Sequence, residues 1–171
     1  MCPQGHRSRR AYNDHVSRED DGLLERHPLL AGMEPPQIAR LSGAGEIESY
    51  QAGDAIVVDG SLGDSMYLLL SGQAAVVKDK RVLAELHAGE FFGEMCLVEP
   101  APRSASVIAR EGTFVFRLPH AALQRLAAED PIAFNHVLVR VVRVLSSRLR
   151  HTNEMLASVG HLADWLSGSL V

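Results

Sequence analysis

Short runs of apolar and β-branched residues alternate with glycines through the middle of the chain, between residues 46 and 118. Most runs have the length of a short strand, and the glycines between them tolerate the positive φ that a tight turn requires. Because no helix-length segment separates most of the runs, the pattern predicts seven or eight antiparallel strands in a jelly-roll β-barrel. The runs are EIESY, AIVVD, SMYLLL, QAAVV, RVLAEL, SASVIA and TFVFRL.

Helical periodicity flanks this β-rich segment on both sides. Residues 21–45 carry apolar positions interrupted by prolines, a pattern typical of short helices. Residues 119–159 contain one short helical segment and a long helix that begins at Asp130-Pro131 and runs to about Val159. The predicted fold is therefore mostly β with flanking helices (α+β), with short N-terminal helices and a long C-terminal helix.

The two ends of the chain lack both patterns. Residues 1–20 are polar, so we predict a flexible N-terminal tail. Residues 160–171 contain two glycines and are predicted to form a short C-terminal helix or tail. Because a helix-turn-helix is several times longer than this last segment, we expect no DNA-binding domain in this chain.

The long helix carries a heptad seam, with its members at alternating spacings of four and three. A seam of this kind packs against a partner helix, so we predict a homodimer formed through the C-terminal helix. The alternative is that both faces of the helix are buried within one subunit. The seam consists of Leu138, Val142, Leu145, Leu149, Thr152, Leu156 and Val159, of which Thr152 alone is polar.

The composition is that of an ordinary globular protein, with 46% hydrophobic and 22% charged residues. No apolar run approaches the roughly 20 residues of a membrane span, and the first residues lack the apolar stretch of a signal peptide. The only cysteines, Cys2 and Cys96, are too few for a disulfide framework or a four-ligand zinc site. We therefore predict an apolar core, no membrane span and a cytoplasmic location.

The net charge of -4 is unevenly distributed. Residues 46–112 hold 11 acidic and 5 basic side chains, whereas the long helix carries four arginines over three turns. These arginines have no aromatic residues between them, so we favour a solvated helix face over nucleic-acid contact.

The segment of residues 91–106 departs from a plain strand pattern. A glycine, a glutamate and a proline interrupt its apolar residues, and an arginine with two small residues follows. Gly93 allows the backbone to approach a ligand closely, and the amides of Met95 and Cys96 open a short helix that favours an anion. Arg103 offers a planar fork of donors that suits phosphate oxygens. We interpret the segment as a loop built around a ligand.

Three neighbouring residues extend this interpretation. Ser104 and Ala105 leave room beside Arg103, and a carboxylate such as Glu94 accepts hydrogen bonds from the hydroxyls of a ribose. Together with the arginine, these residue types indicate a sugar-phosphate site.

The sequence contains no pattern typical of an enzyme. It has no nucleophile with its base, no paired carboxylates and no nucleoside-triphosphate loop, so we expect a sensor and not an enzyme. The eight histidines never show metal-ligand spacing, and no metal is predicted. Haem ligation by His87 and Cys96 is an alternative that we do not favour.

The string F-G-E, in which Arg103 of P-R-S-A follows Glu94 by nine residues, resembles the phosphate-binding cassette of the cyclic nucleotide-binding domain family. The turns and strands upstream are similar to the signature of that family, so the resemblance runs from about Leu23 to Val159. The upstream residues that carry it are Tyr50, Gly53, Gly63-Asp64, Tyr67 and Ser71-Gly72.

The resemblance implies a role for each site residue. Arg103 would pair with the cyclic phosphate, Glu94 would accept the ribose 2′-hydroxyl, and the loop backbone would complete the cradle. Thr152 and Asn153 would reach the adenine across a dimer. The residues that the resemblance assigns to the ligand are Phe92, Gly93, Glu94, Met95, Cys96, Arg103, Ser104, Ala105, Thr152 and Asn153.

The predicted function is that of a regulatory sensor domain whose ligand is cAMP or cGMP, with cAMP favoured. Ligand binding would be transmitted through the C-terminal helix to an unknown effector protein. The alternative is a ligand-independent, dimeric protein-interaction module with a degenerate cyclic-nucleotide-binding fold.

Overall fold

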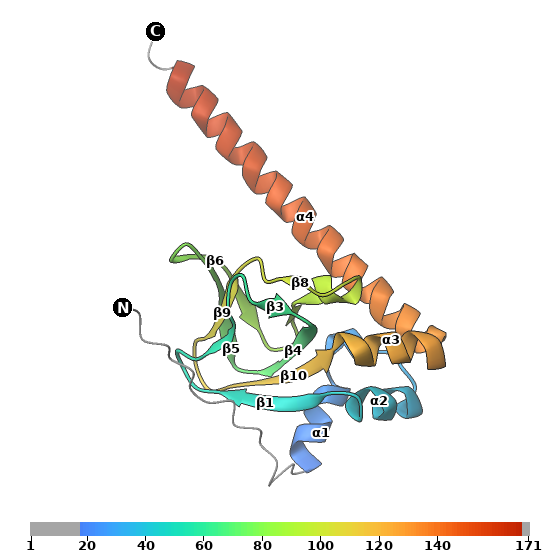
Figure 1. Cartoon of the computed structure of the whole chain (residues 1–171). Helices are drawn as coiled ribbons and strands as arrows, with labels where there is room; N and C mark the ends of the chain where they lie inside the picture. Colours follow the sequence, from blue (N-terminus) through green and yellow to red (C-terminus); the bar gives the residue numbers. More distant parts are fainter. Residues whose placement is uncertain (1–17, 169–171) are drawn as a thin grey trace. The chain divides into compact units, whose positions relative to one another are not determined.

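The computed structural model describes the backbone of residues 18–168 and the side chains of residues 22–159 (Figure 1). The predicted tail of residues 1–20 lies almost wholly outside the described residues, as do Cys2 and the side chains after Val159. The chain forms two compact units, the first ending at His136 and the second beginning at Val137. Each unit is described by itself.

The strands of the first unit form two four-stranded sheets and one two-stranded sheet, and every strand pair is antiparallel. The first sheet has the order β1 (Glu46–Tyr50), β10 (Thr113–Pro119), β4 (Ser65–Ser71) and β7 (Phe91–Phe92). The second has the order β2 (Ala55–Val57), β9 (Ser106–Ala109), β5 (Gln73–Lys78) and β6 (Arg81–His87). The third joins β3 (Leu62–Gly63) to β8 (Ala101–Pro102).

This architecture confirms the predicted antiparallel β fold with flanking helices. The sheets are separate and do not close into one continuous barrel. Positive φ angles at Gly53, Gly60, Gly72 and Gly89 place these glycines in turns, as the punctuation of the sequence predicts, whereas the punctuating Gly63 lies in β3 and has no positive φ.

One apolar core contains residues from both four-stranded sheets. Alternate residues of a strand point to opposite faces, so Tyr67 and Leu69 of β4 belong to this core, with Val115 of the neighbouring strand β10. The residues of β4 that point the other way are buried as well, because α1 also contacts this strand. Burial on both faces explains why β4 is a continuous apolar run in the sequence. The core consists of Tyr50, Ile56, Val57, Tyr67, Leu69, Ala74, Leu86, Phe92, Val107, Ala109 and Val115.

Three short helices precede the first strand: α1 (Arg18–Glu25), the 3₁₀ helix η1 (Pro28–Leu30) and α2 (Pro35–Ser42). Both η1 and α2 begin with proline in the first turn, where the missing N–H costs no helical hydrogen bond. The helix α1 begins at Arg18, within the segment predicted to be a tail.

Two helices follow the last strand: α3 (His120–Glu129) and α4 (Pro131–Gly168). Asp130 separates them, and its Oδ1 accepts the Ala133 N–H at 3.0 Å, which caps the start of α4. The long helix begins where it was predicted to begin but continues past Val159 to Gly168. A single glycine such as Gly160 costs a helix only about 1 kcal/mol, so it does not by itself end one.

No helix among residues 18–168 has the length and apolar character that crossing a membrane demands.

His27 ties the N-terminal helices to the turn before β7. Its Nδ1 accepts the Leu29 N–H at 3.2 Å, so Nε2 carries the hydrogen and donates to the Glu90 carbonyl oxygen, also at 3.2 Å. The side chain is only 3% exposed. Burial lowers the pKa of His27 below its usual 6.5, and the hydrogen bond to Glu90 opposes that shift only in part.

We expect the free energy of unfolding to fall when the pH is lowered from 7 to 5. The folded chain favours neutral His27, so its contribution is complete above the unfolded pKa of 6.5 and is lost as the pH falls below it toward the folded pKa. Urea unfolding at both pH values measures the effect. His27→Asn keeps an acceptor for the Leu29 N–H but does not titrate, so its pH dependence should be shallower. Equal slopes for the two proteins would contradict the assignment.

Candidate functional site

Strand β7 leads directly into the predicted loop. Gly93 follows it with φ of 73°, in the left-handed region, and the 3₁₀ helix η2 (Glu94–Leu97) begins at the next residue. A Cβ atom on Gly93 would lie 2.5 Å from Arg103 Nη1 and 2.9 Å from the Ser65 carbonyl oxygen. Position 93 therefore requires glycine for two reasons: the backbone has a positive φ, and Arg103 approaches too closely to leave space for a Cβ atom.

Arg103 follows β8, whose pairing with β3 fixes its backbone. The Arg103 N–H donates to the Ser61 carbonyl, and the Arg103 carbonyl accepts the Gly60 N–H, each at 2.8 Å. A Cβ atom on Gly63, in β3, would lie 2.7 Å from Arg103 Nε. The guanidinium thus lies between two glycines, Gly63 and Gly93, that are 30 residues apart in the chain.

An aromatic pair and a carbonyl orient the guanidinium. Arg103 Nη2 donates to the Ser65 carbonyl oxygen at 2.6 Å, and Cζ lies 5.6 Å from the centre of the Tyr67 ring. The Tyr67 ring stacks on Phe92, with ring centres 5.0 Å apart and planes inclined by 7°. A cation over an aromatic face is attracted to it, so two contacts define the position of the Arg103 guanidinium, one with the Ser65 carbonyl and one with the Tyr67 ring.

Arg103 has no carboxylate partner among the residues whose side chains are described. The nearby acid Asp64 instead accepts Ser65 Oγ at 2.9 Å and Arg117 Nη2 at 3.4 Å, and these interactions lower the pKa of Asp64. Arg117 also pairs with Glu46 at 2.8 Å. Asp64 and Glu46 are thus engaged by Arg117 and not by the half-buried guanidinium of Arg103.

The predicted residues of η2 have different environments. Cys96 is 1% exposed, and burial raises the pKa of its thiol to about 11, so the side chain fills the core and does not react. The Met95 side chain is 60% exposed, so only the backbone of Met95, as part of η2, has a position that the fold fixes. Glu94 is half-buried next to Gly93.

Ser104 and Ala105 continue the loop from Arg103 to β9, with Ser104 exposed and Ala105 half-buried. The first unit therefore brings the eight predicted residues between Phe92 and Ala105 into two adjoining segments that meet at Gly93 and Arg103.

Thr152 and Asn153 lie on α4, in the second unit, and both are exposed. Thr152 Oγ1 donates to the Arg148 carbonyl at 2.9 Å, a bond within the same helix. Their assignment to the ligand stays a prediction.

Reasoning from the sequence did not assign Ser65 or Tyr67 to the site. Tyr67 was noted only as part of the upstream signature. Alternation along β4 was the available signal, because it places Tyr67 on the same face as Leu69, and the register pairs Tyr67 with Phe92. The Ser65 carbonyl is a backbone group that any residue would supply, so the sequence carries no signal for it.

A separate groove lies between α2 and α3, which neighbour each other in Figure 1. It contains none of the predicted site residues, and an ion pair of Arg40 with Asp130, 3.0 Å long, crosses its rim. The groove is lined by Arg40, Leu41, Ala44, Leu118, Ala122, Leu123, Arg125, Leu126, Glu129 and Asp130. No group of His, Cys, Asp and Glu side chains within residues 22–159 is arranged to hold a metal ion.

Comparison with known proteins adds independent findings. Residues 47–130 match the family model described as cyclic nucleotide-binding domain. Over 106 residues, or 62% of the chain, the sequence is 40% identical to the cAMP-dependent protein kinase regulatory subunit of Hypocrea atroviridis, of which it covers 23%. The chain thus spans about a quarter of the length of this curated relative.

Solved structures share the fold. A cyclic nucleotide-binding domain from Methylobacillus flagellatus KT is similar with a TM-score of 0.70 and 27% identity, covering 80% of this chain and 79% of that one. The catabolite activator protein of Thermus thermophilus is similar with a TM-score of 0.65 and 30% identity, covering 78% of this chain and 63% of that one. The family resemblance that was predicted from the cassette is confirmed.

We expect Gly93→Ala to destabilise the chain more than Gly53→Ala does. Both glycines have positive φ, which costs alanine about 1 to 2 kcal/mol, but a Cβ atom on Gly53 meets nothing within 4 Å. The clash with Arg103 and Ser65 therefore lowers the free energy of unfolding further in Gly93→Ala but not in Gly53→Ala. Urea unfolding of the two variants measures the difference, and equal losses would show that Arg103 does not occupy the space beside Gly93.

Proposed function

The chain belongs to the cyclic nucleotide-binding domain family, and we propose that it is a regulatory sensor domain for cAMP whose C-terminal helix transmits ligand binding. One observation carries the proposal: Arg103 is half-buried, oriented by the Ser65 carbonyl and the Tyr67 ring, and without a carboxylate partner among the described side chains. A partly desolvated cation of this kind is stabilised by an anion that enters the site. The planar guanidinium fork suits the two free oxygens of a cyclic phosphate.

The sugar is assigned to Glu94. Its carboxylate is half-buried at the start of η2, one residue after Gly93, and a carboxylate accepts hydrogen bonds from hydroxyl groups but repels a phosphate. A ligand that presents a hydroxyl to Glu94 and an anion to Arg103 matches both charges. The ribose 2′-hydroxyl beside the ring phosphate of a cyclic nucleotide has this arrangement.

We favour cAMP over cGMP because the relative with 40% identity is named a cAMP-dependent regulatory subunit. The matched relatives of this type are regulatory domains, and we propose no catalytic step for the chain. A buried free thiol at Cys96 supports the proposed cytoplasmic location.

The proposed route of transmission is α4. Its heptad seam is exposed at Val142, Leu145, Leu149, Leu156 and Val159, by 38% to 64%. Apolar residues at this spacing are stabilised by packing against a second helix of the same kind, which supports a homodimer. Thr152, within the seam, and its neighbour Asn153 would then face the adenine of the partner's ligand.

The same exposed seam also supports the second candidate, a ligand-independent dimeric module. That candidate leaves the Arg103 geometry unexplained, because a module without a ligand has no use for an unneutralised guanidinium between two glycines. The effector that would receive the signal is a separate partner or another part of a longer protein.

We expect Arg103→Ala to weaken cAMP binding by about 30-fold to several thousand-fold, because removal of one partner of a desolvated charged pair costs about 2 to 5 kcal/mol. Arg103→Lys should also bind more weakly, since lysine lacks the fork. Isothermal titration calorimetry with cAMP, cGMP and AMP provides the measurement.

Arg110→Ala is the matched control, because this exposed arginine lies seven residues further along the chain and its backbone N–H donates to the Gln73 carbonyl of β5. It should bind cAMP as the unaltered chain does. Unchanged affinity in Arg103→Ala would refute the sensor proposal and leave the ligand-independent module.

We expect Leu149→Glu to shift the chain from dimer to monomer, because it places two like charges in the centre of the seam. Ser147→Glu adds the same charge on the opposite face of α4 and should leave the dimer intact. Sedimentation velocity at several protein concentrations distinguishes the two. A chain that is monomeric without any substitution would exclude the seam as a homodimer interface.

A further inference from the structure

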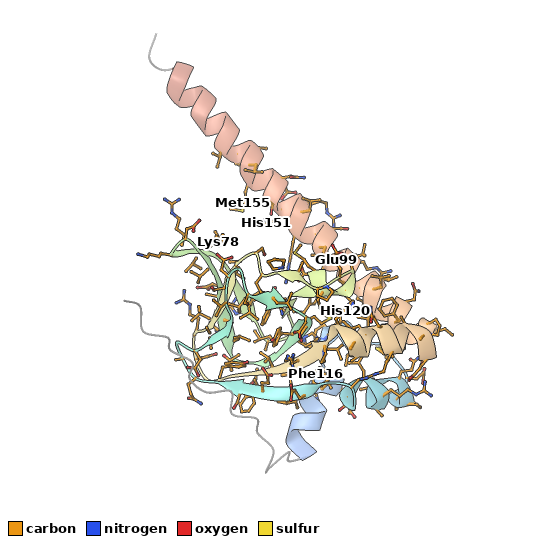
Figure 2. All side chains as sticks on the ribbon, in the orientation of Figure 1. Lys78, Glu99, Phe116, His120, His151 and Met155 are labelled. Carbon is orange, nitrogen blue, oxygen red and sulfur yellow. The ribbon has the colours of Figure 1, made fainter. Side chains whose placement is uncertain are left out.

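The first residue of α3, His120, which is labelled in Figure 2, forms hydrogen bonds with two other segments of the first unit. Its backbone N–H donates to the Asp64 carbonyl oxygen at 2.7 Å. Its imidazole Nδ1 lies 2.5 Å from the Cys96 carbonyl oxygen. Because a carbonyl oxygen only accepts, Nδ1 carries a hydrogen and donates it.

Both segments, η2 and the residues at Asp64, lie next to groups that contact Arg103. Cys96 belongs to η2, which begins immediately after Gly93, the residue that leaves space for the guanidinium. Asp64 precedes Ser65, whose carbonyl oxygen accepts Arg103 Nη2. His120 is thus hydrogen-bonded to both segments that lie beside the guanidinium. Its side chain bonds to η2, and its backbone bonds to Asp64.

The backbone bond is available to any residue at this position except proline, whereas the bond to η2 depends on the imidazole. The N-cap of α3 is Pro119, which offers no side-chain hydrogen bond of its own. His120 therefore supplies the specific polar link between α3 and η2 that the structure shows.

We propose that His120 is a positioning residue: its Nδ1–H holds η2 in the arrangement that accepts the nucleotide and links that arrangement to the start of α3. The inference rests on the proposed function, since it concerns the same site. Without this hydrogen bond, η2 spends part of its time away from Arg103, and in those molecules the site is not assembled. The apparent affinity for the nucleotide then falls in proportion to the fraction of molecules whose site is assembled. The net strength of one hydrogen bond corresponds to a loss of about 3- to 10-fold.

Three variants test the role of the donor. His120→Ala removes it, His120→Asn restores an N–H close to the Nδ1 position, and His87→Ala removes an exposed imidazole elsewhere in the chain. Affinity for cAMP is measured by calorimetry. Amide hydrogen exchange, with and without saturating cAMP, is followed separately for residues 94–98 and for residues 121–126.

In the unaltered chain and in His87→Ala, cAMP should slow exchange in both segments. His120→Ala should bind about 3- to 10-fold more weakly, and at saturation it should protect residues 94–98 while residues 121–126 lose most of their protection. His120→Asn should recover both the affinity and the protection of α3.

Two results would overturn this inference but not the sensor proposal. In the first, His120→Ala keeps its full affinity for cAMP and the protection of α3. In the second, His120→Ala raises hydrogen exchange uniformly across the chain, and His120→Asn does not restore it. The second result would identify a general structural role. Failure of the unaltered chain to bind any cyclic nucleotide would overturn the sensor proposal and this inference together, so the two failures are distinguishable.

Discussion

The guanidinium of Arg103, which has no carboxylate partner among the described side chains, organises the site. Arg103 is held by the Ser65 carbonyl and the Tyr67 ring, between two glycines that lack the Cβ atoms that would displace it. The nearby acid Asp64 is engaged by Arg117. The fold therefore keeps a cation oriented and partly dehydrated without supplying its counter-charge, and this arrangement has a physical cost that an incoming anion would remove.

Because a bound anion would remove this cost of holding a partly dehydrated cation, ligand binding is expected to raise the stability of the first unit. A ligand at 100 times its dissociation constant stabilises a folded protein by about 2.7 kcal/mol, a large share of the 5 to 15 kcal/mol that is typical of a domain. The contacts that orient Arg103 come from β4, in which six of the seven residues are buried, so the cation lies against a well-packed strand. Preorganisation of this kind reduces the entropy that binding would otherwise lose.

The features predictable from the sequence were those set by local chemistry. Glycine punctuation predicted turns, and the composition of residues 91–106 predicted a loop that contains both Gly93 and Arg103, which the structure places side by side. The contributions of Tyr67, Ser65 and His120 depend on strand register and on backbone groups, which no local pattern encodes. The predicted end of α4, at about Val159, came too early, because a single glycine such as Gly160 costs a helix only about 1 kcal/mol and α4 continues to Gly168.

The helix α3 is attached to its surroundings at both ends. His120 joins its first residue to η2 and to Asp64, and Asp130, which follows its last residue, pairs with Arg40 of α2 and caps α4. Between these points α3 is a ten-residue helix with Ala122, Leu123 and Leu126 buried, so it is stiff over its length. A displacement of η2 would therefore reach Asp130 by movement of α3 as one body, and the Arg40–Asp130 pair is one of the contacts that would oppose it. The Arg40 side chain is 59% exposed and the Asp130 side chain 14%, so solvent screens this pair, and it would add little to the resistance of the buried residues of α3.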